Sequence, residues 1–260
     1  MAISPSGWLT ELVSQLNLLG EMNERLDIDF TRIGRKWVCY FDLLGFSELL
    51  KQSIVNAFFH WELCLWDLKN WSDRFPDLEY AYFSDTFLIY ASDDSAKSFS
   101  HIESASRWFF QIALRRNIPL RGAMACEEFY ADKPKAIFLG KALVEAAKTE
   151  QKYNWIGFVL CNSVVERMNE IGLPADQRLN YRKWSVPTKS DKANSKSEEV
   201  FALLFGASYP TNGQNTLVQE LEKMAERETE STVKEKYENS LKFLNHFGVP
   251  QIILPTEKDS

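Results

Sequence analysis

Trp37-Val38-Cys39-Tyr40-Phe41-Asp42-Leu43-Leu44-Gly45-Phe46-Ser47 is the apolar run around which the chain is organised. It is typical of a buried strand that carries one carboxylate, Asp42, and then turns through Gly45. Alternate residues of a strand share a face, so Asp42 lies beside Tyr40, opposite Cys39, Phe41 and Leu43. A carboxylate removed from water requires a cation or hydrogen-bond donors. A purely structural interpretation is also open, because Asp at a strand end often caps the next helix.

The composition is that of an ordinary globular protein. The 260 residues suffice for one large domain with a substantial core, and 45% of them are hydrophobic and 25% charged. The net charge of −6 and the pI near 5.3 disfavour a broad surface for nucleic acid or membranes, since both require clustered Lys and Arg.

The cysteines and the N-terminus indicate a cytoplasmic protein. The four cysteines are far apart in sequence and form no C-x-x-C pair, so we expect reduced, buried thiols: Cys39, Cys64, Cys126 and Cys161. No basic region precedes an apolar one at the N-terminus, and no apolar run reaches membrane-spanning length. We therefore expect neither export nor membrane insertion.

Two amphipathic helices are predicted around the Asp42 strand. Residues 8–26 carry apolar side chains at helical spacing, and a second helix runs from Ser47 to about Trp71. The apolar stripe of the second helix consists of Leu50, Ile54, Phe58, Trp61, Leu65 and Leu68. Such a stripe usually packs in the core, and a dimer interface is the alternative.

A β-hairpin with an acidic turn follows. Residues 79–83 and 86–91 are aromatic and β-branched runs, and Ser84-Asp85 between them predicts a two-residue turn. Taken alone, Asp85 is a common turn residue. Its combination with Asp42 at the end of a neighbouring strand is suited to divalent cations, which prefer oxygen ligands.

The remaining chain predicts an α+β sheet with helices largely on one face. Gly122 in one strand permits close approach of the backbone. We expect helices at 95–117, 141–150 and most of 215–246, strands at 119–126, 155–160, 178–186 and 199–205, a polar loop at 188–197, and a C-terminal tail.

At this point four motifs, in order, resemble the class III nucleotidyl cyclases. Residues 41–47 resemble the first metal-binding motif, and Ser84-Asp85 resembles the second, usually Gly-Asp. Arg121-Gly122 resembles the central strand. Residues 140–150 follow the helix motif Gly-x-x-x-Asn-x-Ala-x-Arg-x-Glu without a gap. The resemblance covers residues 37–205 and is specific because the four weak motifs occur in the family's order.

The departures from the family pattern concern the nucleotide. Val144 stands where the family has the Asn that orients the ribose, and Lys148 stands where it has the transition-state Arg. Ala81 and Ile137 stand where purine cyclases carry polar side chains that read the base. Both positions are apolar here, which disfavours purine selection.

Chains with these departures and a long charged C-terminal helix resemble the pyrimidine cyclases of the bacterial Pycsar anti-phage system. Those enzymes are soluble, metal-dependent homodimers whose cyclic UMP or cyclic CMP triggers a separate, suicidal effector. The resemblance implies a palm-type, ferredoxin-like catalytic domain at 37–206, with a helical segment at 1–36 and a helical extension at 207–260. We favour UTP because uridylate producers are the commoner kind among the resembling chains, but no residue distinguishes uracil from cytosine, and CTP stays open.

The chemistry itself requires that the 3′-hydroxyl of a nucleoside triphosphate attack the α-phosphate and expel pyrophosphate. Two Mn²⁺ or Mg²⁺ ions per site serve this reaction, with Asp42, Asp85 and the backbone carbonyl of Leu43 as candidate ligands. Lys148 and Arg182 would offset charge on the phosphates. By the resemblance, the Asp pair and the phosphate-facing cation come from different protomers of a homodimer.

Several of these residues also have ordinary structural interpretations. Lys148 fits a solvated helix lysine, and Lys183 fits the role of Arg182 nearly as well. Tyr40 fits a core position as well as a contact to base or sugar. The nucleotide-facing positions under the cyclase interpretation are Tyr40, Phe46, Ala81, Ile137 and Val144.

Two other classes of protein stay open. A non-catalytic cyclase-like module that binds a nucleotide or partner would explain Val144, although it would not need two converging carboxylates. A palm-type polymerase requires a basic groove, which the acidic composition disfavours. A diguanylate cyclase would carry a Gly-Gly-Asp/Glu-Glu-Phe hairpin, and Ser84-Asp85-Thr86 does not match it.

Overall fold

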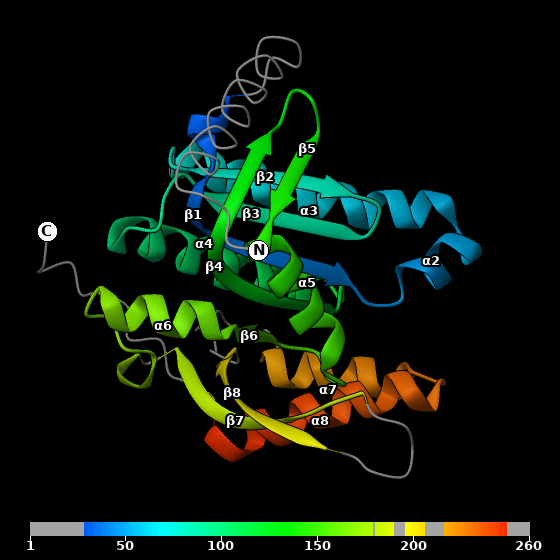
Figure 1. Cartoon of the computed structure of the whole chain (residues 1–260). Helices are drawn as coiled ribbons and strands as arrows, with labels where there is room; N and C mark the ends of the chain where they lie inside the picture. Colours follow the sequence, from blue (N-terminus) through cyan, green and yellow to red (C-terminus); the bar gives the residue numbers. More distant parts are fainter. Residues whose placement is uncertain (1–28, 179, 190–195, 206–215, 249–260) are drawn as a thin grey trace, which may run out of the picture.

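The computed structural model describes residues 29–178, 180–189, 196–205 and 216–248 (Figure 1). The helix predicted at 8–26, most of the loop at 188–197 and the C-terminal tail lie outside these ranges. No helix within the described ranges is long and apolar enough to cross a membrane.

The Asp42 strand lies in the middle of a ferredoxin-like βαββαβ unit. Its elements are β1 (Gly34–Leu43), α2 (Phe46–Gln52), α3 (Ile54–Arg74), β2 (Leu78–Phe83), β3 (Thr86–Ala91), α4 (Ala96–Arg115) and β4 (Leu120–Asp132). The strands are antiparallel in the order β2-β3-β1-β4. This order is the one that two split βαβ crossovers produce. The predicted fold class is therefore confirmed.

The second half of the chain extends the sheet beyond β4. Its elements are β5 (Ile137–Gly140), α5 (Lys141–Lys152), β6 (Phe158–Leu160), α6 (Asn162–Glu170), β7 (Tyr181–Pro187), β8 (Ser197–Leu203), α7 (Leu217–Arg227) and α8 (Ser231–Phe247), with short 3₁₀ turns at Phe30–Arg32 and Ala175–Gln177. The sheet continues as β4-β6-β8-β7, and β5 pairs with β4 off this path. The sequence did not predict α6.

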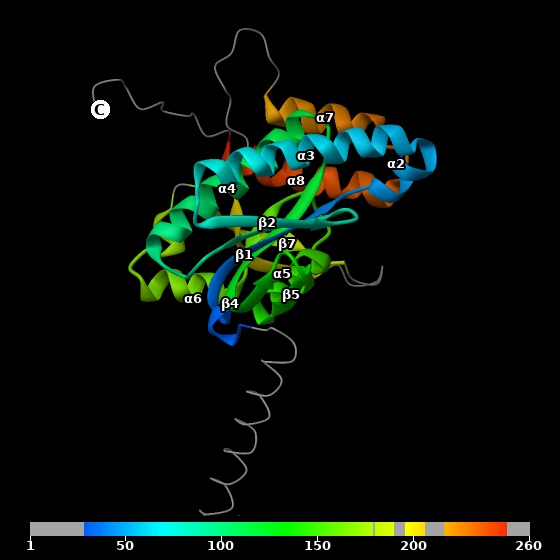
Figure 2. The ribbon, with the colours of Figure 1, turned by 90° about the horizontal axis from the view of Figure 1, so that it is seen from above.

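The two faces of β1 have different partners. Phe41 packs against Phe109 of α4 and Phe158 of β6, each with ring centroids 5.1 Å apart. Gly122 is required beside them, because a Cβ there would come within 2.8 Å of both Phe41 and Phe158. Helices α3 and α4 cover this face, whereas α5 lies on the opposite face, which carries Asp42 (Figure 2). Figure 2 shows α7 and α8 on the side of α3 and α4, so most helices lie on one side, as predicted, whereas α5 and α6 lie on the other.

The predicted helix from Ser47 to Trp71 is two helices, and this is a correction. Ser53 is extended (φ −163°, ψ 111°), and its side chain accepts a hydrogen bond from the Asn56 amide (3.2 Å), which starts α3 as a new helix. The core interpretation of the stripe is wrong for its first part, where Ile54 is 72% and Phe58 58% exposed. It is correct near the end of α3, where Leu68 is buried.

The C-terminal helices pack onto the same core. Leu217 and Leu221 of α7 and Phe243 and Leu244 of α8 are buried. The predicted helix at 215–246 is interrupted between α7 and α8. The division at 36/37 and 206/207 stays a prediction. All four cysteines are free and buried, as predicted.

Candidate metal and nucleotide site

The structure brings Asp42 and Asp85 to the same end of the sheet. Asp42 ends the central strand opposite Thr86, the residue after Asp85. The Leu43 amide donates to the Asp85 carbonyl (3.0 Å), and the Trp61 indole of α3 donates to the Ser84 carbonyl (3.1 Å). These two hydrogen bonds fix the hairpin turn against the end of β1. The strand end and the turn that carry the two carboxylates are therefore adjacent, and the charge of Asp85 acts on Asp42, while their role as metal ligands stays a prediction.

Asp42 is electrostatically strained. Burial raises its pKa, the hydrogen bond and charge of Arg121 lower it, and the charge of Asp85 raises it again. Arg121 lies directly across the strand pair and forms an ion pair with Asp42. Two carboxylates that converge at a partly buried strand end thus compete for positive charge, which a divalent cation would supply.

The donor set fits a hard divalent cation. Asp42, Asp85 and the backbone carbonyl of Leu43 offer only oxygen atoms, the ligands that Mg²⁺ and Mn²⁺ prefer. Within the described ranges, no group of three or more His, Cys, Asp or Glu side chains could hold a metal. Phosphate oxygens and water would therefore complete the coordination, as is usual for Mg²⁺ on nucleotides.

Tyr40 and Ala81 lie on the Asp42 face of the sheet. Cross-strand pairs connect Tyr40 to Leu88 and Leu88 to Ala81, so that the three side chains form one row. The Tyr40 hydroxyl shares a hydrogen bond with the Thr86 hydroxyl (3.2 Å), one row closer to Asp42. Ala81 is only 5% exposed. Tyr40 therefore borders the row of Asp42, whereas Ala81 lies two strands away from β1.

Ile137 is placed elsewhere. It pairs with Asp132 at the far end of β4, and the adjacent Phe138 packs toward Tyr90 with ring centroids 6.1 Å apart. A cavity of about 320 Å³ is lined by Ile33, Glu128, Phe129, Tyr130, Ile137, Leu139, Gly140 and Lys141. Ala81 does not line it, so the structure does not join the two expected base-reading positions in one cavity.

Val144 and Lys148 lie one turn apart on the outer side of α5. The helix turns Ala146 and Glu150 toward the sheet, whereas Lys148 is exposed and Val144 is 52% exposed. Both line a shallow surface cavity of about 610 Å³. Within one chain Lys148 therefore points away from the face that carries Asp42.

Arg182 is also distant from the carboxylates of its own chain. It lies on β7, four strands from β1 in the sheet order, which corresponds to roughly 19 Å. Its guanidinium donates to the Tyr181 carbonyl (2.8 Å). Lys183, the alternative, forms an ion pair with Glu199 (3.8 Å).

Three other cations surround Asp42, and the sequence did not assign them to the site. Arg121 was recognised only as part of a strand motif. Lys189 follows β7, and Lys236 belongs to α8. The pKa of each lysine is lowered, because burial and the Arg121 charge outweigh the opposite effect of the Asp42 and Glu150 charges. Only strand register and the packing of α8 reveal this cluster.

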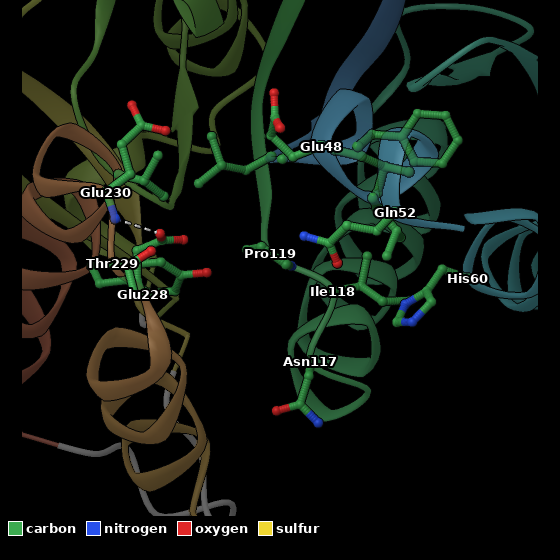
Figure 3. A pocket seen from close by; sticks show the side chains of 16 residues that line it. Glu48, Gln52, His60, Asn117, Ile118, Pro119, Glu228, Thr229 and Glu230 are labelled. Carbon is green, nitrogen blue, oxygen red and sulfur yellow. Dashed lines mark hydrogen bonds between the residues drawn. The ribbon is translucent and has the colours of Figure 1, made fainter. Parts of the chain in front are cut away.

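Phe46 lines a cavity at the start of α2. This cavity, of about 460 Å³, lies between α2, the segment after α4 and the turn from α7 to α8. Figure 3 shows Glu228 and Glu230 on one side of it and Gln52 and Asn117 on the other. Because Glu48 lines the cavity as well, three carboxylates would repel a triphosphate there. We do not place the substrate in this cavity, and the nucleotide contact of Phe46 stays a prediction.

Glu150, at the end of α5, is a buried carboxylate of the same cluster. Its side chain is 1% exposed and lies 2.9 Å from Nη2 of Arg121. Burial raises its pKa to about 7, an effect that the Arg121 charge opposes and the Asp42 charge reinforces. The folded chain therefore retains a proton on Glu150 in a range of pH where the unfolded chain has released it.

This difference predicts how stability depends on pH. Glu150 contributes stability that is complete below about pH 4.5 and is lost as the pH rises through about 7. Glu150→Gln should therefore gain stability relative to the wild type between pH 5 and pH 8, by on the order of 3 kcal/mol. Urea unfolding at pH 5 and at pH 8 measures the free energy of unfolding of each variant. Glu128→Gln, which changes an exposed carboxylate, is the control. Identical pH dependence of the wild type and Glu150→Gln would contradict the assignment.

Comparison with known proteins finds likeness in structure only. No family model matches the chain, and no curated protein matches its sequence. Similar solved structures include the adenylyl cyclase CyaB from P. aeruginosa, at 11% identity and TM-score 0.47, covering 69% of this chain and 97% of that one. The guanylyl cyclase domain of the RhoGC fusion protein from the aquatic fungus Blastocladiella emersonii has 9% identity and TM-score 0.48, covering 66% and 98%. The catalytic core of a rhodopsin-guanylyl cyclase with converted specificity, in complex with ATPαS, has 10% identity and TM-score 0.47, covering 66% and 96%.

These neighbours are adenylyl and guanylyl cyclase domains. The fold of this chain is established by its own strand order and hairpin, and a likeness of this degree adds nothing about substrate.

Proposed function

We propose that the chain is a pyrimidine nucleotide cyclase that converts UTP into 3′,5′-cyclic UMP and pyrophosphate, with CTP as the alternative substrate. One observation carries the proposal: the hairpin turn holds Asp85 against the end of β1, beside Asp42, through the hydrogen bond from the Leu43 amide. Neither strand pairing nor the turn requires two carboxylates there, whereas phosphoryl transfer with divalent ions does.

The proposed mechanism assigns a role to each group at this end of the sheet. Asp42, Asp85 and the carbonyl of Leu43 would hold the ions. A bound Mn²⁺ or Mg²⁺ ion would lower the pKa of the ribose 3′-hydroxyl and neutralise charge on the triphosphate. Tyr40, in the neighbouring row, would contact sugar or base. Lys148 would offset charge on the pyrophosphate as it leaves.

The position of Lys148 supports a homodimer with shared sites. It is exposed on α5 and directed away from Asp42 of its own chain, so a partner's α5 would have to supply the cation. Exposed apolar residues lie on α2, on α3 and on the strand before the Asp85 turn, as a subunit interface would require: Leu50, Ile54, Val55, Phe58, Phe59, Tyr82 and Phe83. We propose that this surface contacts a second copy and that Arg182 acts, if at all, across the interface.

Base selection is the second testable part of the proposal. In the resembling purine cyclases, polar side chains at the positions of Ala81 and Ile137 read the base, and this chain has no polar group at either position. A polar group of the purine left unpaired there would cost about 1–3 kcal/mol. With Mn²⁺ and equal concentrations of the four triphosphates, kcat/KM for UTP or CTP should exceed that for ATP and GTP by at least roughly tenfold. Chromatography of the products measures the rates. Faster turnover of ATP or GTP than of both pyrimidines would contradict pyrimidine selection.

Val144 favours a second candidate, a non-catalytic cyclase-like module that binds nucleotide. An apolar residue at that position removes the side chain that orients the ribose in the resembling family. Release of pyrophosphate distinguishes the two candidates. The module would bind UTP or CTP, as measured by calorimetry, without releasing pyrophosphate, whereas the cyclase would release it.

By the same resemblance, we propose a cytoplasmic role in anti-phage defence, in which the cyclic product acts on a separate effector protein. Infection should then raise cyclic UMP or cyclic CMP in cells that carry the chain and not in cells with Asp85→Asn. Equal nucleotide levels and equal phage yield in the two strains would contradict this role.

A further inference from the structure

Arg121 is a buried cation that two carboxylates share. Its Nη2 atom is ion-paired with Oδ2 of Asp42 and lies 2.9 Å from Oε1 of Glu150. The exposed fractions of the three side chains are 11% for Arg121, 18% for Asp42 and 1% for Glu150. The guanidinium thus links the candidate metal ligand on β1 to a carboxylate on α5.

The pairing between Arg121 and Glu150 is incomplete. Within the described ranges, the buried Nε and Nη1 atoms of Arg121 and the Oε1 atom of Glu150 have no hydrogen-bond partner. Donors and acceptor are complementary, because a guanidinium can form two parallel hydrogen bonds to one carboxylate. While Arg121 is paired with Asp42, these atoms lack hydrogen-bond partners. A small shift of the guanidinium toward Glu150 would let them form hydrogen bonds with each other.

Binding of a divalent ion to Asp42 would force such a choice. The ion would take the carboxylate that now neutralises Arg121, and a guanidinium cannot discharge by losing a proton. A buried charge without a counter-ion costs several kcal/mol. Lys189 and Lys236 are close enough for the Arg121 charge to lower the pKa of each, so these two cations do not relieve this cost. Glu150 is the carboxylate that remains within reach of the displaced guanidinium.

We propose that Arg121 is a stand-in for the metal and Glu150 is the positioning residue that retains it: Arg121 neutralises Asp42 in the metal-free chain and pairs with Glu150 when a divalent ion occupies Asp42. This inference rests on the proposed metal site and goes beyond it, because it assigns a function to two residues that do not touch the substrate. Glu150 thereby sets the affinity of the site for the ion.

Manganese binding without nucleotide tests the proposal independently of activity. The electron paramagnetic resonance signal of free Mn²⁺ gives the affinity of the full-length wild type, Glu150→Gln, and the control Glu128→Gln. Glu128 lies on β4, the strand of Arg121, but it is exposed and forms an ion pair with Lys141 (2.8 Å). Glu150→Gln should bind Mn²⁺ at least about tenfold more weakly, because Arg121 would then have only Asp42, whereas Glu128→Gln should bind like the wild type.

Removal of the competing cation should reverse the effect. Arg121→Met should bind Mn²⁺ more tightly than the wild type, and Arg121→Met with Glu150→Gln should bind within about threefold of Arg121→Met. A merely structural role of Glu150 would leave the double variant weakened. Circular dichroism verifies the fold of each variant. If Glu150→Gln does not fold, the Mn²⁺ affinity of Arg121→Met relative to the wild type tests the proposal by itself.

The outcomes separate this inference from the metal site on which it rests. If Asp42→Asn leaves Mn²⁺ affinity unchanged, the metal site is wrong and the inference falls with it. If Asp42→Asn abolishes binding but Glu150→Gln has no effect, or if Arg121→Met binds no more tightly than the wild type, only the inference is overturned.

Discussion

Asp42→Asn and Asp85→Asn are each expected to lower cyclase turnover by on the order of 10³-fold or more, with the fold intact. Each substitution replaces an anionic oxygen ligand by a neutral amide of the same shape. The hydrogen bond from the Leu43 amide to the backbone carbonyl of Asp85 holds the Asp85 turn at the end of the strand that carries Asp42. Because both are needed for the same ions, loss of either one should be as damaging as loss of both.

The matched control is Asp73→Asn, an exposed carboxylate on α3. It should keep wild-type turnover. Asp42→Asn also removes one of the two carboxylates that pair with Arg121, so its melting temperature should fall. Activity is therefore compared well below that temperature. Near-native turnover in either Asp42→Asn or Asp85→Asn would contradict the metal assignment.

Mixing two inactive variants should restore activity if the sites are shared between subunits. Asp42→Ala and Lys148→Ala should each be nearly inactive alone. After the two are refolded together, half of the dimers are mixed, and each mixed dimer contains one intact site. Activity should therefore recover to roughly a quarter of the wild-type value.

The control mixture is Asp42→Ala with Asp85→Ala. Both residues belong to the same half of the shared site, so no arrangement of subunits produces an intact one, and activity should not recover. Absence of recovery in the Asp42→Ala and Lys148→Ala mixture, despite demonstrated exchange of subunits, would place the whole site within one chain.

The parts of the site that local sequence determines were predictable. The apolar run ending at Asp42 predicts a buried strand, and the two β-rich runs around Ser84-Asp85 predict a hairpin. Ser84 adopts a φ of 54°, the left-handed conformation that such a turn requires. Together these two local signals were enough to predict that the carboxylates converge.

Features that depend on register or distant packing were not predictable. Arg121 faces Asp42 only because β1 and β4 pair in one particular register. Lys236 reaches the cluster because α8 is held at Ser240, whose side chain bonds to the Ile156 amide (2.8 Å) and carbonyl (2.7 Å). No periodicity in the sequence specifies either contact.

The errors at α2 and α3 have the same cause. The apolar spacing continues through Ser53, so the pattern predicts one helix, whereas the extended Ser53 caps a second one. Apolar spacing also does not distinguish a core face from an interface. Ile54 and Phe58 keep the spacing of buried residues and are nevertheless exposed.

Analysis of the products that the purified chain forms decides whether it is a pyrimidine nucleotide cyclase. The chain is incubated with Mn²⁺ and UTP, and separately with CTP, and the nucleotide product and pyrophosphate are both quantified, with Asp85→Asn in parallel. The account predicts a 3′,5′-cyclic pyrimidine nucleotide and pyrophosphate in equal amounts, and neither product from Asp85→Asn. Release of nucleoside diphosphate and inorganic phosphate instead, or equal product from Asp85→Asn, would contradict it.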